Sequence, residues 1–236
     1  MREQFVEYRD GDALLEGFLC FDESQPGPRP TVLLNHAYGG RDEFVIRKAR
    51  RLAWSGYACF ALDNYGKGIR GNTPAESTAL MMPFMNDRAA LRRRLLAGLS
   101  AVKSLPIVDA RRIAVLGFCF GGLCALDFAR ADADVRGVVS FHGLLKTSPI
   151  TEPKIRARVL MLHGYDDPLA PPEDVLAVAK EFSAAGADWQ LHAYGNTVHA
   201  FTNPKANDRA AGKQYDEAAD RRSWHALEEF LGEVLK

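Results

Sequence analysis

The sequence lacks several features that mark particular classes of protein. Lysine and arginine together number 30, and aspartate and glutamate also number 30, so the formal net charge is zero. No excess of one sign points to a nucleic acid or an anionic membrane as partner. No stretch approaches the roughly 18 apolar residues of a membrane span, and the first residues lack the apolar run of a secretory signal. We therefore expect a soluble, cytoplasmic protein.

Cysteine is also scarce, with four residues in a chain of 236: Cys20, Cys59, Cys119 and Cys124. Their spacing matches no metal-ligand pattern, and a chain of this length can bury a sufficient core without disulfides. Free cysteine usually packs as a small hydrophobe, which is how we interpret Cys20, Cys59 and Cys124. We expect all four to be reduced thiols.

The order of apolar segments indicates one α/β domain over residues 1–236. Two apolar runs, 5–8 and 14–21, flank a turn-forming cluster and predict an antiparallel hairpin. From Thr31 onward, apolar runs alternate with amphipathic segments, which is typical of a mostly parallel, doubly wound sheet with helices on both faces. The expected strands are 31–35, 57–62, 112–117, 135–141, 158–163 and 189–193. The expected helices are 43–55, 87–104, 123–130, 172–185 and 215–235.

The most informative stretch is Gly-Phe-Cys-Phe-Gly-Gly at positions 117–122, directly after an apolar strand. It has the pattern of a nucleophile elbow with a thiol in place of a hydroxyl. The strand-to-helix turn leaves no room for a Cβ atom beside the nucleophile, which explains Gly117 and Gly121. A thiol at a helix N-terminus is biased toward thiolate. The alternative, a packed core cysteine, has no need of glycine on both sides, so we predict that Cys119 is a nucleophile.

Two further side chains complete a possible triad at the carboxyl ends of the strands, where ligands bind in such sheets. His199 lies in the loop after the last strand and is the expected general base; the other interpretation is a solvated loop histidine. Asp166 and Asp167 both follow an earlier strand. We favour Asp167, which directly precedes Pro168, as the carboxylate that orients the imidazole, although aspartate also serves in ordinary turns.

Acyl transfer also needs donors for a developing oxyanion. The backbone N–H of Phe120, which follows the nucleophile, is one expected donor, and that of Ala37 is the other. The side chains that we expect to contact substrate are His36, Tyr38, Tyr65, His142 and Met82. The run 80–85 that contains Met82 has two interpretations, a pliable pocket wall or core packing for a helix that begins near residue 86. The arginines at 88, 92, 93 and 94 are expected on a solvated helix surface.

Three motifs together resemble the dienelactone hydrolase family of α/β-hydrolases: the elbow at 117–122, Gly-Tyr-Asp-Asp-Pro-Leu-Ala-Pro at 164–171 and His-Ala-Phe-Thr-Asn-Pro at 199–204. The resemblance covers nearly the whole chain from Thr31. It implies an α/β-hydrolase fold, a triad of Cys119, His199 and Asp167, and oxyanion donors at Ala37 and Phe120. It also implies that esters or lactones are the substrates and that no metal or organic cofactor is needed.

Two departures from the family pattern concern the substrate. Members that act on dienelactone carry a glutamate where this chain has His36, so that thiol activation differs or His36 binds substrate. Their substrate-binding arginines have no counterpart in 80–85 or in 200–203, so we expect a less anionic substrate.

The sequence thus predicts a cysteine hydrolase of small esters or lactones that works through an acyl-enzyme, as a monomer or homodimer. The alternatives are an acyltransferase, a peptidase-like hydrolase with the same triad, or a non-catalytic binding protein.

Overall fold

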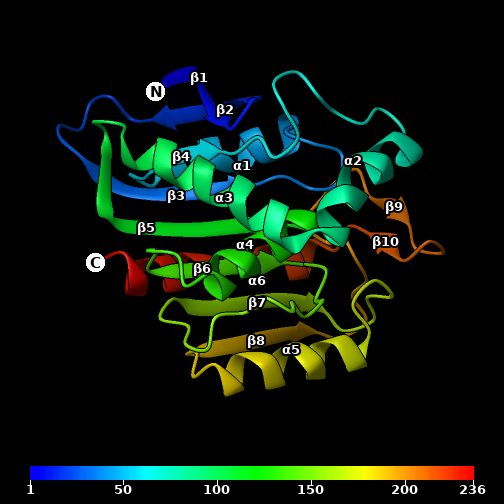
Figure 1. Cartoon of the computed structure of the whole chain (residues 1–236). Coiled ribbons are helices and arrows are strands. Elements are labelled where there is room, and N and C mark those ends of the chain that lie inside the picture. Colours follow the sequence, from blue (N-terminus) through cyan, green and yellow to red (C-terminus); the bar gives the residue numbers. More distant parts are fainter.

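The computed structural model describes all residues from 1 to 236, and its centre is one eight-stranded sheet (Figure 1). The strands lie in the order β1-β2-β4-β3-β5-β6-β7-β8. Their bounds are β1 (Arg2–Asp10), β2 (Ala13–Phe21), β3 (Arg29–Asn35), β4 (Ala58–Ala61), β5 (Val108–Phe118), β6 (Gly137–Phe141), β7 (Arg158–Gly164) and β8 (Trp189–Tyr194). The pairs β1–β2 and β2–β4 are antiparallel, and all later pairs are parallel. The predicted N-terminal hairpin and mostly parallel sheet are therefore confirmed.

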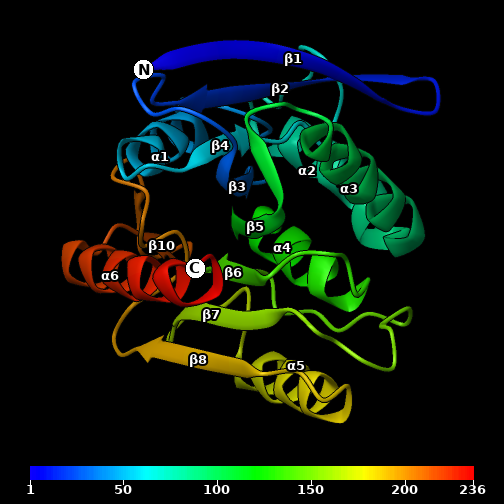
Figure 2. The same ribbon diagram turned by 90° about the vertical axis from the view of Figure 1, so that its left-hand side faces the viewer.

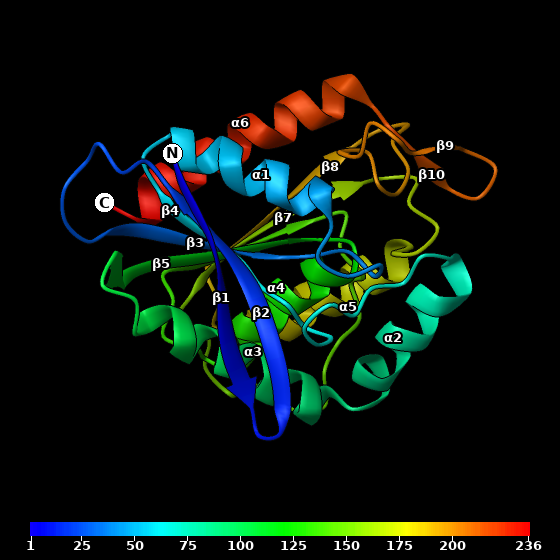
Figure 3. The ribbon, with the colours of Figure 1, turned by 90° about the horizontal axis from the view of Figure 1, so that it is seen from above.

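Helices cover both faces of the sheet. They are α1 (Glu43–Trp54), α2 (Pro74–Asn86), α3 (Arg88–Lys103), α4 (Phe120–Arg130), α5 (Pro172–Ala184) and α6 (Glu217–Val234). Seen from above, α1 and α6 lie on one side of the sheet and the others on the opposite side (Figure 3). Each face has its own apolar core, because strands buried on both sides alternate their side chains between the two layers. This is the α/β-hydrolase architecture that the sequence predicts.

Local sequence explains where the helices begin and end. The Asp42 side chain accepts hydrogen bonds from the N–H groups of Phe44 and Val45 at 3.1 and 3.3 Å, which starts α1. The same helix ends before Gly56, whose φ of +96° suits a residue without a Cβ atom. Such caps recur at α3, where the side chain of Asp87 accepts from the N–H of Ala90 at 2.8 Å.

One helix and one small hairpin were not predicted from the sequence. The run 80–85 belongs to α2, which is capped by Thr73 and begins at Pro74, whereas the sequence predicted no helix between residues 55 and 86. Pro83 inside the helix obscured its continuity. A small hairpin of β9 (Asn207–Asp208) and β10 (Lys213–Gln214) was also missed, because strands of two residues show no periodicity.

The carboxyl ends of the parallel strands meet at one end of the molecule, beside α2 and the β9–β10 hairpin (Figure 1). The β1–β2 ribbon runs along one edge of the sheet (Figure 2). None of the helices combines the length and the apolar character needed to cross a bilayer.

Candidate active site

Cys119 occupies a sharp turn between β5 and α4, with φ 57° and ψ −118°. A Cβ atom on Gly117 would lie 1.9 Å from the carbonyl oxygen of Gly121, and one on Gly121 would lie 2.3 Å from that of Asn35. Both contacts are impossible, so both positions require glycine. Residue Cys119 is partly exposed, whereas the other three cysteines are buried. The turn therefore presents one thiol, held in a strained backbone conformation, at the end of the sheet.

His199 and Asp167 are paired beside this thiol. The Nδ1–H of His199 donates to Oδ2 of Asp167 at 2.7 Å, and both side chains are buried. Asp166 is exposed, and its backbone bonds to Thr197 instead. The structure thus brings Asp167, and not Asp166, to the imidazole. Because Nδ1 is bonded to the carboxylate, Nε2 is the nitrogen left for another partner, and it has no hydrogen-bond partner in the structure.

The sulfur of Cys119 interacts with this imidazole, and the two groups shift each other's pKa. Burial opposes charge on either group, but the charge of His199 lowers the pKa of the Cys119 thiol. In turn, burial is outweighed by the charge of Cys119 and the carboxylate of Asp167, which raise the pKa of His199 to about 10. Each group therefore favours the charged form of the other, the thiolate beside the imidazolium.

The backbone N–H groups of Phe120 and Tyr38 also contribute to the lowered pKa of the Cys119 thiol. Phe120 is the oxyanion donor that the elbow predicts, and the amide of Ala37 as second oxyanion donor stays a prediction. The carbonyl of Ala37 accepts hydrogen bonds from the N–H of Gly40 at 3.1 Å and from Nδ1 of His36 at 2.7 Å. Those two bonds fix the peptide plane that follows Ala37, and the N–H of Tyr38 belongs to that plane.

His36 is fully buried and does not line the cavity described below. While its Nδ1–H donates to Ala37, its Nε2 accepts from the N–H of Asn64 at 3.2 Å. With both nitrogens used and burial lowering its pKa, the ring is neutral. The expectation of direct substrate contact is therefore not met. His36 instead joins the loop after β3 to the loop after β4.

Tyr65 has a similar bracing position. Its hydroxyl donates to the carbonyl of Tyr38 at 2.9 Å, and its ring stacks on Phe120 with centroids 6.1 Å apart. Tyr65 is therefore in contact with both Tyr38 and Phe120, although its side chain does not line the cavity.

His142 lies beside His199, with ring centroids 5.1 Å apart in an edge-to-face arrangement. Its Nε2 pairs with the hydroxyl of Thr202 at 2.8 Å, and its backbone has a positive φ of 36°. Burial, followed by the charge of His199, lowers the pKa of His142 well below its ordinary value. A neutral imidazole thus flanks the charged one, and His142 borders the cavity as predicted for a residue that contacts substrate.

A cavity of about 800 Å³ opens over Cys119 and His199. Its walls include Tyr38, Phe44, Met81, Phe118, Leu144 and Leu169, and its rim includes Lys146, Lys205 and Lys213. Met81 lines it, while Met82 is 39% exposed on the outside of α2, one residue out of phase with the prediction. Lysines 205 and 213 were not identified from the sequence, because nothing local links their segment to the cavity.

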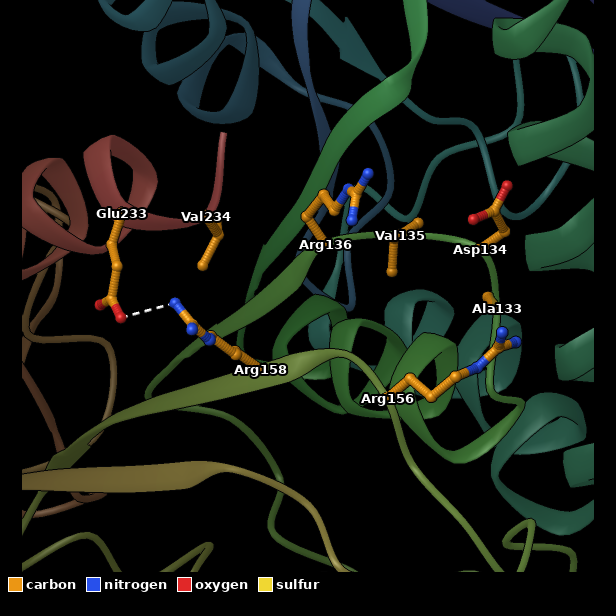
Figure 4. Close-up of a pocket in the computed structure, with 8 residues that line it drawn as sticks. All are labelled: Ala133, Asp134, Val135, Arg136, Arg156, Arg158, Glu233 and Val234. Atoms are coloured by element: carbon orange, nitrogen blue, oxygen red, sulfur yellow. Dashed lines mark hydrogen bonds and ion pairs between the residues drawn. The ribbon is translucent and has the colours of Figure 1, made fainter. Parts of the chain in front are cut away.

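Another depression, of about 350 Å³, lies at the opposite ends of the strands (Figure 4). Three arginines border it, but Arg158 points toward Glu233 while Arg136 and Arg156 point elsewhere. Arg156 pairs with Asp132, so the guanidinium groups do not converge on one ligand position. The structure also holds no group of three or more His, Cys, Asp or Glu side chains suited to a metal ion. The cavity over Cys119 is thus the better candidate site.

Comparison with known proteins gives a family match over almost the whole chain. The model of the dienelactone hydrolase family matches residues 15–235. A protein of Aquifex aeolicus, whose name assigns it provisionally as a carboxymethylenebutenolidase, is 25% identical over 238 residues, with 99% of each chain covered.

Solved structures agree with this match. A dienelactone hydrolase-like promiscuous phosphotriesterase from metagenomic libraries has a TM-score of 0.95 and 36% identity, covering 100% of this chain and 99% of its own. The dienelactone hydrolase of Anabaena variabilis has a TM-score of 0.72 and 21% identity, with 100% and 99% covered. At that identity the second likeness shows the fold alone.

Proposed function

Because this chain belongs to the dienelactone hydrolase family, we propose that it hydrolyses small carboxylic esters or lactones through an acyl-enzyme on Cys119. The observation that carries the proposal is the hydrogen bond from His199 to Asp167 beside a thiol whose pKa the imidazole lowers. A thiolate at the mouth of an apolar cavity is a nucleophile in position to meet a carbonyl carbon.

In the first half of the reaction, the sulfur attacks the carbonyl carbon and the carbonyl oxygen gains the negative charge. We expect the backbone N–H of Phe120 and an N–H of the loop after β3, at Ala37 or Tyr38, to donate to that oxygen. The intermediate then collapses, the carbon–oxygen bond to the alcohol breaks, and Nε2 of His199 gives its proton to the leaving oxygen. The product of this half is a thioester on Cys119.

The second half uses the same imidazole as a base. The charge of Cys119 is the foremost influence that raises the pKa of His199, and acylation removes that charge. The pKa of the imidazole then falls, so that Nε2 can take a proton from water as the water attacks the thioester. Collapse of the second intermediate breaks the carbon–sulfur bond and releases the acid. The thiolate is then left beside the imidazolium, which holds the proton taken from water.

Hydrolysis of neutral phosphotriesters is a second candidate. The observation in its favour is the whole-chain likeness, at 36% identity, to the structure described as a promiscuous phosphotriesterase. The cavity of about 800 Å³ is also wide for a small lactone alone. In this case the sulfur would attack phosphorus, the bond from phosphorus to the aryl oxygen would break, and His199 would give its proton to that leaving oxygen. Water would then cleave the phosphorus–sulfur bond and restore the thiolate.

The experiment compares wild-type protein with Cys119→Ala and Cys119→Ser on p-nitrophenyl acetate, a panel of unsubstituted lactones and a neutral aryl phosphotriester. We expect an ester burst of about one equivalent per chain and an acyl adduct on Cys119 by mass spectrometry. Cys119→Ala should abolish both. Turnover without any adduct or burst, or turnover retained by Cys119→Ala, would contradict the proposal.

Added alcohol or amine separates hydrolysis from the alternatives. Products that shift largely to the new ester or amide at millimolar acceptor indicate an acyltransferase, and cleavage of peptides alone indicates a peptidase-like enzyme. An adduct that forms but never turns over indicates a binding protein that has lost catalysis.

A further inference from the structure

The β9–β10 hairpin is bonded directly to the backbone of His199. The N–H of His199 donates to the carbonyl of Gly212 at 2.9 Å, and its carbonyl accepts from the N–H of Gln214 at 3.1 Å. His199 is thus held on both sides by residues 13 and 15 positions later in the chain. We propose that this hairpin positions the imidazole against Cys119, and that Gly212 is a positioning residue for the reaction; the proposal rests on the function proposed above.

Gly212 also packs against the loop that carries Asp167. Its φ is +72°, and a Cβ atom there would lie 2.2 Å from Cγ and 2.8 Å from Cδ of Pro168, the residue after Asp167. One position of the hairpin therefore bonds to the histidine and contacts the carboxylate loop at the same time. A side chain at 212 must displace Pro168, the hairpin, or both.

The third contact is with the loop that faces the thiol. The ammonium of Lys213 lies 5.5 Å from the ring centroid of Tyr38, which lines the same cavity as Cys119. The hairpin thereby touches the loops of the base, the carboxylate and the second amide donor. It also borders the cavity through Asn207, Asp208 and Lys213, so that a bound substrate contacts the same element.

Few contacts other than those of the hairpin hold the imidazole of His199 in position. The His199 side chain has a single hydrogen bond of its own, to Asp167, and the direction of its ring depends on where the backbone is held. A displacement of about 1 Å in a catalytic group can cost on the order of a hundredfold in rate. A bulky contact at 212 moves both partners of the pair relative to the elbow, which is anchored separately on β5 and α4.

The test is Gly212→Ala with Gly186→Ala as its matched control. Gly186 has a similar φ of +64°, but a Cβ atom there would meet nothing within 4 Å. The two variants impose comparable backbone strain, and Gly212→Ala alone adds the collision with Pro168. We expect kcat of Gly212→Ala on p-nitrophenyl acetate to fall on the order of a hundredfold, with KM changed far less, while Gly186→Ala retains wild-type values.

A readout independent of any ester is the pH profile of Cys119 alkylation by iodoacetamide. Gly212→Ala should move the profile to higher pH, because the thiolate loses its aligned imidazolium, and Gly186→Ala should not. If no ester, lactone or phosphotriester is cleaved by the wild type but the profiles separate in this way, the proposed function fails and the positioning role stands. Equal alkylation profiles and equal kcat for Gly212→Ala and Gly186→Ala would overturn the positioning role of Gly212.

The double variant Gly212→Ala with Pro168→Ala covers the case in which the single variant does not fold. It removes Cγ and Cδ of residue 168 and leaves only Cβ, 3.6 Å from the new methyl group, which is an ordinary contact. Recovery to the kcat and alkylation profile of Pro168→Ala alone supports the proposal. A folded double variant that remains as impaired as Gly212→Ala, or inactive where that variant does not fold, contradicts it.

Discussion

Nδ1 of His199 lies 2.7 Å from Oδ2 of Asp167, a residue 32 positions earlier in the chain, and both side chains are buried. This contact fixes which nitrogen of the imidazole carries its proton toward the carboxylate, and so turns Nε2 toward the thiol. The other carboxylate oxygen of Asp167, Oδ1, accepts a hydrogen bond from the N–H of Leu169 at 2.8 Å. The orientation of the base is thus set by a carboxylate that cannot rotate away.

Replacement of this carboxylate should impair catalysis and leave the site folded. In Asp167→Asn, the amide can hold the ring in the wrong tautomer and cannot stabilise its positive charge, so we expect kcat to fall about 10²- to 10⁴-fold. The pKa of His199, which is raised to about 10, should also fall, because the carboxylate contributes to that rise. Steady-state kinetics and NMR titration of the imidazole measure these two effects.

Asp166→Asn is the matched control, since the adjacent carboxylate is exposed and does not touch the imidazole. It should retain wild-type kcat and the same His199 titration. Equal losses in the two variants would remove Asp167 from the triad.

The thiol should react at a pH where ordinary cysteines do not. Burial alone would raise the pKa of Cys119, but His199 and the two amides lower it. The thiolate is the form present above the pKa, so a lowered pKa extends reactivity with iodoacetamide to lower pH than the ordinary value of about 8.5 allows. In His199→Gln the profile should shift upward by about 1–3 units.

Rates of alkylation between pH 5 and 10, with mass spectrometry of the modified peptide, give this profile. Buried Cys20, Cys59 and Cys124 should stay unmodified in the folded protein. His192→Gln, which changes an exposed histidine on β8, should leave the profile unchanged. A wild-type midpoint near 8.5 would mean that no thiolate–imidazolium pair forms.

His36 should tolerate glutamine and reject glutamate. Its ring donates to the carbonyl of Ala37 and accepts from the N–H of Asn64, and a glutamine amide can supply both a donor and an acceptor. A carboxylate has no donor for the carbonyl oxygen and would be buried without a paired cation. We therefore expect His36→Glu to lower the free energy of unfolding by about 3–5 kcal/mol at pH 7.

Urea unfolding of both variants across pH tests the sign of this effect. Burial raises the pKa of a carboxyl group above its unfolded value of about 4.3. The folded state then binds the proton more tightly, so the stability of His36→Glu should decline as pH rises through and above that value. His36→Gln should follow the wild-type pH dependence, and a His36→Glu protein as stable as His36→Gln at pH 7 would show that the site accepts the charge.

Much of the site could be predicted because its requirements are local. The elbow needs glycine at 117 and 121 for steric reasons that a sequence displays directly, and the apolar run before it has to be a buried strand. Asp167 and His199 follow strands whose carboxyl ends meet at one edge. Their convergence follows from the sheet topology, although which aspartate faces the ring depends on loop geometry.

The remaining details depend on orientations that sequence does not display. The peptide plane between Ala37 and Tyr38 is set by the bonds of the Ala37 carbonyl to His36 and Gly40, which no local pattern reveals. Met81 and not Met82 lines the cavity because α2 starts at Pro74 and so sets a different helical phase. In each case the deciding contact comes from a hydrogen bond or an element that the apolar pattern leaves open.

Long-range charge pairing was the other source of error. The arginines at the start of α3 were expected in solvent, but Arg88 is buried and binds Asp127 on α4, 39 residues later. Its Nε lies 2.8 Å from Oδ2 of that residue. Arg93 alone of the four keeps a largely exposed side chain, at 67%. A cluster of like charges predicts a solvated face only when no buried carboxylate lies opposite, and that cannot be inferred without the fold.

Asp127 should therefore matter for stability well beyond an average surface carboxylate. It accepts from Arg88 and, at 2.9 Å, from Nη1 of Arg130, and all three side chains are buried. Asp127→Asn leaves two buried guanidinium groups without this anion, and we expect a loss of about 3–5 kcal/mol in the free energy of unfolding. Asp134→Asn, at a carboxylate that is 85% exposed and paired with Lys103, should cost no more than about 1 kcal/mol.

Removal of both partners should cost less than removal of one. In a double variant, Arg88→Met with Asp127→Leu, no unpaired charge remains at the α3–α4 contact, because Arg130 keeps its two bonds to Glu181 at 2.8 and 2.9 Å. Urea unfolding should then show the double variant to be more stable than Asp127→Asn, since apolar side chains can replace a buried ion pair with little loss. A double variant less stable than Asp127→Asn would indicate that the ion pair itself, and not the avoidance of an unpaired charge, stabilises the packing of α3 on α4.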